Sequence, residues 1–237
     1  METIGSSLSF GYETEIESAY VITIKGHELS ERMASRCEES CRAVEMPYKR
    51  WDAFDGTNGD IVVPESLRGQ DWVRWIRVVN EALAKTEVCT VLSHVSLWAR
   101  CVEIDRPIVA LEHDAVVLRR VTHHPAFNAI SYLGSIEQVQ SGYWGSIPIH
   151  GQMNRNYRFQ LRTHAYSVDP FMARRLLASI VKSGVATSID VMIRSDIYTI
   201  LQFGIFAYDQ ADGVSTAPEK DDKKKDQRLT RINNKII

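Results

Sequence analysis

The sequence has few cysteines and no strong excess of charge. Its 237 residues contain four cysteines, and none of the four forms a C-x-x-C pair. We therefore expect buried thiols that serve neither as disulfides nor as metal ligands. The formal net charge of -2 shows no sign of the basic excess that general nucleic-acid binders carry.

Long hydrophobic runs are also missing. No segment approaches 18 uninterrupted apolar residues, and Met1 to Tyr12 lacks the basic start and apolar stretch of a secretory signal. These absences favour a cytoplasmic protein. With 44% hydrophobic and 24% charged residues, the chain has enough apolar material for one core, so a single catalytic domain is expected over residues 1–210.

Residues 211–237 differ from the rest in composition. Positions 219–237 carry seven Lys or Arg against four Asp or Glu and show no apolar periodicity. We predict a charged, flexible tail that is dispensable for folding. Contact with phosphate-bearing partners is the alternative for this segment.

Short strands alternate with helices along the domain. Ala19–Ile24 reads as a strand and is followed by a helical spacing of Leu29, Met33, Cys37 and Cys41. A second strand is expected before Asp55-Gly56, and residues 88–101 follow a helical period again. Residues 64–86 are compatible with an amphipathic insertion or with core packing. This alternation predicts an α/β domain with a largely parallel sheet, whose ligands gather at the carboxyl ends of the strands.

One later helix has clear signals at both ends. Asp169 can cap it, Pro170 occupies the favoured first position, and Gly184 can stop it.

An acidic triplet follows the most apolar short run. Ile108–Leu111 predicts a strand buried on both faces, and it leads directly into Glu112-His113-Asp114. Carboxylates at the end of such a strand lie where a ligand would bind, and their oxygens suit Mg2+ or Mn2+. Taken alone, the same pattern is also typical of a turn or a helix cap.

Three motifs follow one another in the middle of the chain: Ser93-His94, Leu97-Trp98 and a strand ending in an acidic triplet. Their order and spacing, with weaker matches at Arg50 to Gly56 and Ala165 to Ser167, resemble glycosyltransferase family 25, the lipooligosaccharide and procollagen galactosyltransferases. The resemblance implies a GT-A-like (Rossmann-like) nucleotide-sugar-binding domain. It also implies a metal-assisted, inverting transfer of a hexose, galactose or glucose, from a UDP-sugar to a hydroxyl acceptor such as a glycan.

The resemblance also implies roles for individual residues. Asp114 would be the first metal ligand and Glu112 the second, holding Mn2+ or Mg2+, while Asp190 would be the catalytic base. Asp190 could instead cap a helix or neighbour the metal. The donor-binding residues would be Arg32, Asp52, Asp55, Ser93 and His94. His94 has a second interpretation, as a helix histidine that packs on the sheet.

The sequence departs from the family pattern at His113, where the family has a second acidic residue. Strand alternation would point His113 away from Glu112 and Asp114, which makes it a bystander. If the strand turns at Leu111 instead, His113 enters the metal shell as a third ligand. A catalytically silent sugar- or nucleotide-binding homologue is therefore an alternative function.

A second alternative keeps the enzyme and changes the acceptor to a hydroxylated nucleic-acid base. The basic tail and an aromatic loop from Gly142 to Tyr157 would then make the contacts. In the primary hypothesis the same loop faces a glycan acceptor, although it could equally be an ordinary surface loop.

Overall fold

The fold was determined as a computed structural model that describes residues 14–70, 72, 75–124, 128–134, 147–148, 163–194 and 197–209. An eight-stranded sheet forms its centre, with strand order β3-β2-β4-β9-β7-β10-β5 and β8 paired to β10. The strands are β2 Ala19–Thr23, β3 Tyr48–Asp52, β4 Ile108–Glu112, β5 Ala115–Val117, β7 Ile130–Gly134, β8 Ile147–Pro148, β9 Ala165–Val168 and β10 Ile200–Asp209. A separate two-stranded ribbon pairs β1 (Thr14–Glu15) with β6 (His123–His124).

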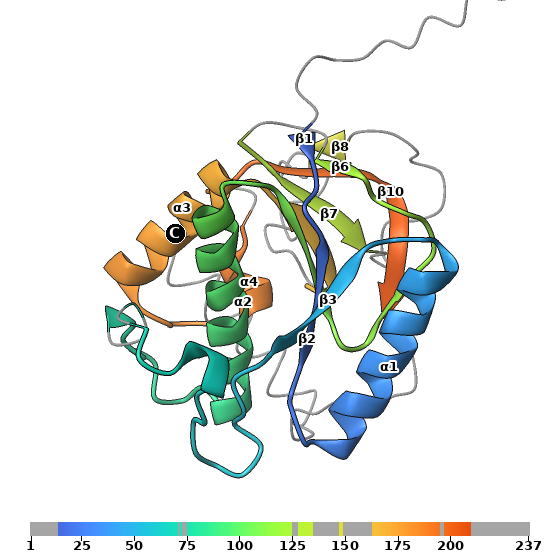
Figure 1. Cartoon of the computed structure of the whole chain (residues 1–237). Coiled ribbons are helices and arrows are strands. Elements are labelled where there is room, and N and C mark those ends of the chain that lie inside the picture. Colours follow the sequence, from blue (N-terminus) through green and yellow to red (C-terminus); the bar gives the residue numbers. More distant parts are fainter. Residues whose placement is uncertain are drawn as a thin grey trace, which may run out of the picture.

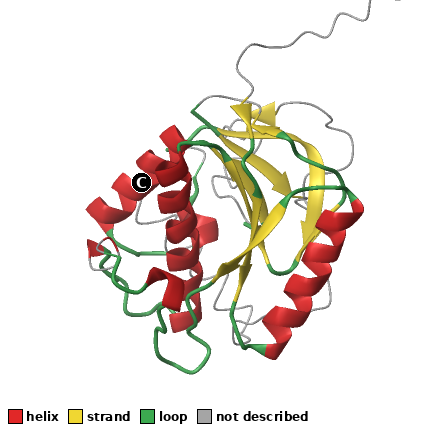
Figure 2. Ribbon diagram, viewed as in Figure 1, coloured by secondary structure: helices red, strands yellow, loops and turns green. Residues whose placement is uncertain are grey.

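The helices cover both faces of this sheet (Figures 1 and 2). They are α1 Glu28–Ala43, α2 Lys85–Ile104, α3 Pro170–Ser183 and the short α4 Ile189–Met192, with a 3-10 turn at Glu65–Leu67. In Figure 1, α1 lies on one side of the sheet and α2 with α3 lies on the other. The expected α/β class is therefore confirmed.

The sheet is mixed, and its parallel part is the part that positions the site. Strand β2 runs parallel to both β3 and β4, with Thr23 opposite Asp52 and Ile22 opposite Glu112. Strand β9 then joins β4 in the antiparallel sense, with Ala165 opposite Leu111. The carboxyl ends of β2, β3 and β4 consequently meet at one edge of the sheet, beside the start of β9.

Strand alternation divides the apolar residues between two cores. Ile108 and Ala110 of β4 face the core under α2 and α3, whereas Val109 and Leu111 face the core under α1. All four side chains are buried. Strand β4 is therefore covered on both faces, as its continuous apolar run predicts.

The expected ends of α3 are also found. Asp169 Oδ1 accepts a hydrogen bond from the Met172 amide at 2.7 Å, Pro170 begins the helix, and Gly184 follows it with a φ of 72°. A Cβ at Gly184 would lie 2.6 Å from the carbonyl oxygen of Arg77 and 2.8 Å from Val79 Cγ1. Glycine is thus required there by its backbone conformation and by the close approach of residues 77–79.

The remaining expectations have mixed outcomes. The four cysteines are free and buried, as expected. Of the two interpretations of residues 64–86, the structure supports core packing: Trp72 and Ile76 pack against the core, and the described residues between 64 and 84 form 3-10 turns and loops. The tail from residue 211 and the loop from Gly142 to Tyr157 lie outside the described residues, apart from the backbone of β8. Within the described part of the chain, no helix is long and apolar enough to cross a membrane.

Candidate active site

The candidate site lies at the carboxyl edge of the parallel strands. Strand β4 ends at Glu112, His113 and Asp114 form a turn, and β5 begins at Ala115. The Glu112 amide donates to the carbonyl of His164, so the residue before β9 is held against the end of β4 at 2.9 Å. The acidic triplet therefore sits where two strands and a turn converge.

Glu112 accepts two hydrogen bonds on a single carboxylate oxygen. Its Oε1 lies 3.1 Å from His94 Nε2 and 2.8 Å from Thr163 Oγ1. Burial raises the pKa of Glu112, but the bonds from His94 and Thr163 outweigh that effect and lower the pKa to about 2. The side chain remains 25% exposed, so an ionised carboxylate is presented at the surface of the site.

His94 belongs to a buried hydrogen-bond chain that runs from α2 through β9. Trp98 Nε1 donates to the Tyr166 hydroxyl oxygen at 2.9 Å, and that hydroxyl lies 2.8 Å from His94 Nδ1. Burial raises the pKa of Tyr166, which keeps its proton available for donation. With Tyr166 donating to Nδ1, the His94 proton resides on Nε2 and is directed at Glu112.

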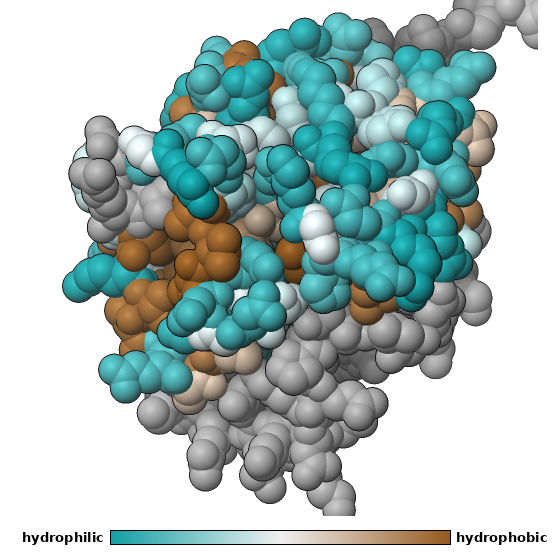
Figure 3. Space-filling model, turned by 60° about the horizontal axis from the view of Figure 1, so that its bottom comes forward, coloured by the Kyte–Doolittle hydropathy of each residue, from teal (hydrophilic) through white to brown (hydrophobic). Residues whose placement is uncertain are grey.

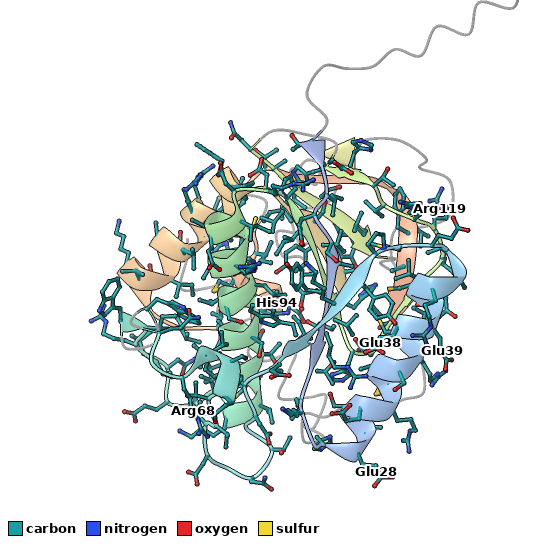
Figure 4. The ribbon with its side chains drawn as sticks, viewed as in Figure 1. Glu28, Glu38, Glu39, Arg68, His94 and Arg119 are labelled. Carbon is teal, nitrogen blue, oxygen red and sulfur yellow. The ribbon has the colours of Figure 1, made fainter. Side chains whose placement is uncertain are left out.

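The hydrogen-bond chain fits both interpretations of His94, as a packing histidine and as a polar group of the site. The side chain is completely buried between α2 and the sheet, as a packing histidine would be. Figure 4 shows it on α2, between the helix and the strands. Its ring nevertheless ends on a carboxylate of the site, so its contribution is to orient Glu112. Trp98 and Tyr166, which match family landmarks in the sequence, belong to the same unit.

Asp190 reaches the same place from α4. Its Oδ1 lies 2.9 Å from Thr163 Oγ1 and 3.1 Å from the Thr163 amide nitrogen. The single hydroxyl proton of Thr163 can be donated to Asp190 or to Glu112, but it cannot fully serve both. Thr163, itself buried, therefore holds the predicted base and the predicted metal ligand side by side.

The pKa of the Asp114 carboxyl group is strongly perturbed. Burial and the neighbouring charge of Glu112 raise its pKa to about 7, and Asp209 and Asp190 act in the same direction. Within the described residues, its Oδ1 is buried and has no hydrogen-bond partner. A buried carboxyl oxygen in this condition is stabilised by a proton or by a cation.

His113 faces the other side of the sheet. Its Nδ1 lies 3.1 Å from Ser30 Oγ on α1, and the same oxygen accepts the Ile24 amide at 2.9 Å. Burial lowers the pKa of His113 and favours the neutral ring. Glu112 points instead to α2, so the two side chains leave the end of β4 in opposite directions.

The predicted donor-binding residues are spread over several elements. Ser93 is buried, donating to the Cys89 carbonyl and accepting the Phe54 amide, so its hydroxyl ties α2 to the segment after β3. Asp55 accepts from the Thr57 amide and hydroxyl, and Asp52 ends β3 at the carboxyl edge. Arg32 is exposed on α1.

The residues present can supply part of a cation shell. Glu112 and Asp114 provide hard oxygen ligands two positions apart, and Asp114 Oδ1 has the unmatched electron pairs that a cation requires. Across the described ranges, no three His, Cys, Asp or Glu side chains are close enough to enclose an ion. Such an arrangement suits Mg2+ or Mn2+, which are commonly bound by one or two carboxylates plus substrate phosphates and water.

Sequence reasoning missed Thr163 as a member of the site. It is a lone threonine before a short strand, and no motif in the sequence distinguishes it. Tyr166 carried a signal, because it lies in a segment that matches the family, but its contact with His94 is visible only in three dimensions.

The comparisons with known proteins agree with the resemblance. Residues 16–144 match the family described as "Glycosyltransferase family 25 (LPS biosynthesis protein)", which is more than half of the 237 residues. The chain belongs to glycosyltransferase family 25. The matched range includes Ser93, His94, Trp98 and the acidic triplet, so the hydrogen-bond chain up to Glu112 is built largely from the matched segment. Asp190 and Thr163 come from the part that follows it.

A galactosyltransferase, LgtC, is similar among solved structures. Its structure in complex with donor and acceptor sugar analogues shares 9% identity with this chain, covering 78% of this chain and 72% of that one at a TM-score of 0.40. No curated protein matches the sequence.

Proposed function

We propose that this glycosyltransferase moves a hexose from a UDP-sugar to a hydroxyl acceptor with inversion, assisted by Mn2+ or Mg2+. The observation that carries the proposal is the convergence of Glu112 and Asp190 on Thr163, next to Asp114, at the carboxyl edge of the parallel strands. Donor and acceptor binding at this edge is what an α/β sheet favours. Family membership supplies the reaction class.

Asp190 is the proposed general base. Its Oδ1 accepts the Thr163 amide at 3.1 Å and lies 2.9 Å from the Thr163 hydroxyl, contacts that hold the carboxylate at this edge of the sheet. The acceptor oxygen attacks the anomeric carbon as its proton passes to Asp190. The bond between that carbon and the β-phosphate oxygen breaks at the same time, and UDP leaves with the electron pair. A single displacement of this kind inverts the anomeric configuration.

Asp114 and Glu112 are the proposed cation ligands. A divalent cation bound there would neutralise charge that develops on the departing diphosphate. Glu112 Oε1 faces His94 and Thr163, so Oε2 is the oxygen that we assign to the cation. Asp114 contributes its unpartnered Oδ1. His113 is excluded from this shell in the proposal because it is directed toward α1.

A panel of nucleotide sugars tests the proposal. The native protein should hydrolyse or transfer from one UDP-hexose in the presence of Mn2+, and chelation should abolish this activity. Asp190→Asn should reduce transfer by about 100-fold or more, since a general base contributes a factor of this size. Glu39→Gln, an exposed change on α1, is the matched control and should be neutral. Release of product with retained anomeric configuration would refute the single displacement.

A further inference from the structure

A buried histidine next to the site lies against a glycine of the neighbouring strand. Strands β7 and β9 are antiparallel and pair Tyr132 with Tyr166. Two positions further along, the same register places Gly134 opposite His164. A Cβ built on Gly134 would lie 2.4 Å from both Cε1 and Nε2 of the His164 ring, and 2.6 Å from the Tyr132 hydroxyl oxygen. The His164 ring therefore occupies space that any side chain at position 134 would need.

The two side chains that face Gly134 have little room to move aside. His164 and Tyr132 are 1% and 0% exposed, and their rings meet edge to face with centroids 6.0 Å apart. In a close-packed interior, a ring has no empty volume into which it can swing. A methyl group at position 134 would consequently push the imidazole, and the backbone that carries it, away from β7.

The backbone that carries this imidazole belongs to the site. The His164 carbonyl accepts the Glu112 amide at 2.9 Å. Thr163, the preceding residue, donates its amide to Asp190 at 3.1 Å, and its hydroxyl oxygen lies 2.8 Å from Glu112 and 2.9 Å from Asp190. Strand β9 begins only at Ala165, so residues 163 and 164 precede its ladder. These bonds hold the two residues on the β4 side, and the His164 ring holds them on the β7 side.

The His164 ring is placed to act through its neighbours. Figure 3 brings forward the lower end of Figure 1, where β2 leads into α1, and its described surface is largely hydrophilic apart from an apolar area on the left. His164 contributes almost nothing to the molecular surface, because it is 1% exposed, whereas Glu112 keeps 25% of its side chain exposed. A substrate would therefore meet the carboxylate, while the imidazole acts on the peptide that holds this carboxylate.

We infer that His164 is a positioning residue of this glycosyltransferase and that Gly134 leaves the space for its ring. The ring fixes the peptide between Thr163 and His164, and this peptide fixes Glu112 and Asp190. In the proposed function these carboxylates are a cation ligand and the general base, so the catalytic part of the inference rests on that function. A misplacement of about 1 Å in such groups costs about 100-fold in rate. The chemical step should therefore depend on this contact more than donor binding does.

Two substitutions and their combination test the contact. Gly134→Ala adds the colliding Cβ and should lower kcat for sugar transfer about 10- to 100-fold, with donor KM changed less than about threefold. His164→Ala removes the ring and should cause a similar loss. Adding Gly134→Ala to His164→Ala should lower kcat by less than about threefold more, because the space left by the ring accepts the methyl group. The control is Gly69→Ala, which should keep the native kcat: Gly69 is exposed, has a φ of 84°, and an added Cβ there meets no atom within 4 Å.

A second measurement requires no turnover. Hydrogen exchange of the Glu112 and Thr163 amides, followed by NMR, reports on their bonds to the His164 carbonyl and to Asp190. Both amides should exchange at least about tenfold faster in Gly134→Ala and in His164→Ala, while the amides of α3 keep their native rates. Gly69→Ala should leave all of these rates unchanged.

Three results would overturn the inference. The first is native exchange together with native kcat in Gly134→Ala. The second is a full, additive loss in the double variant, which would show that the two residues act independently. If Gly134→Ala does not fold, native exchange and native kcat in His164→Ala are the third. A native protein that transfers no sugar, but whose variants show the expected exchange, would refute the proposed function alone.

Discussion

Replacement of Asp114 by asparagine should stabilise the protein at alkaline pH and abolish its activity. The pKa of Asp114 is raised from 3.8 to about 7, a difference of roughly three units. At 1.36 kcal/mol for each unit, the ionised carboxylate costs the folded state up to about 4 kcal/mol above pH 7. Asparagine carries no charge and avoids this cost, so the variant should be more stable by about 2 to 4 kcal/mol at pH 8.

The pH dependence follows from the direction of the shift. A carboxyl group with a raised folded-state pKa contributes its full stability below pH 3.8 and loses it as the pH rises through about 7. The difference between Asp114→Asn and the native protein should therefore be close to zero near pH 4 and reach its maximum by pH 8. A cation changes this balance, because it binds the ionised form and removes the cost.

The melting temperatures of the native protein and of Asp114→Asn are measured at pH 4.5 and at pH 8, each with and without Mn2+. For a domain of this size, 2 kcal/mol corresponds to about 4 to 8 °C. The native protein should gain stability from Mn2+ at pH 8, and Asp114→Asn should gain none while starting from a higher melting temperature. Glu39→Gln should follow the native protein throughout. The reasoning is refuted if Asp114→Asn melts below the native protein at pH 8, or if it retains metal-dependent turnover.

Three further substitutions test other parts of the site. Thr163→Val removes the hydroxyl and keeps the backbone hydrogen bond to Asp190, so kcat should fall about 10- to 100-fold at unchanged donor KM. Thr163→Ser keeps a hydroxyl and should restore kcat. An equal loss in both variants would show that only packing matters. Tyr166→Phe leaves Trp98 Nε1 and His94 Nδ1 buried without this hydrogen-bond partner. The free energy of unfolding, measured by denaturant titration, should fall by about 2 to 4 kcal/mol. A loss under about 1 kcal/mol would contradict the hydrogen-bond chain. His113→Asp restores the family-like triplet, and the Mn2+ to Mg2+ activity ratio should change by less than about tenfold; a larger shift would make His113 a metal ligand.

The elements with strong local signals could be predicted from the sequence. Helix α3 begins and ends as its cap, proline and glycine predict, because those preferences act within a few residues. Strand β4 is fixed by an apolar run that only a doubly covered position accommodates. Because the triplet follows this apolar run directly, the sequence also predicts that it lies at the end of the strand. The structure places Glu112 and Asp114 there.

The partners of the site could not be predicted in the same way. Thr163 reaches Glu112 only because β9 pairs with β4 in the antiparallel sense, and such pairing depends on contacts between residues about 55 positions apart. The irregular backbone after the 3-10 turn is a related case. Trp72 and Ile76 have helical spacing but pack on the core as separate residues, because Val78 pairs with Val185 and the chain is held extended there.

The contrast between Glu112 and Asp114 is the feature of this site with the most chemical content. The two residues are separated by one position, yet hydrogen bonds from His94 and Thr163 lower the pKa of one to about 2, while burial beside that charge raises the other to about 7. Carboxyl groups whose surroundings drive their pKa values apart take different roles. In the proposed function, Glu112 would supply a permanent charge, and Asp114 would exchange a proton for a cation near neutral pH. Removing the His94 bond should therefore act on both groups. His94→Phe should raise the pKa of Glu112 and lower that of Asp114, and it should weaken Mn2+ binding measured by calorimetry at pH 6 more than at pH 8. Equal weakening at the two pH values would show that the carboxyl groups titrate independently.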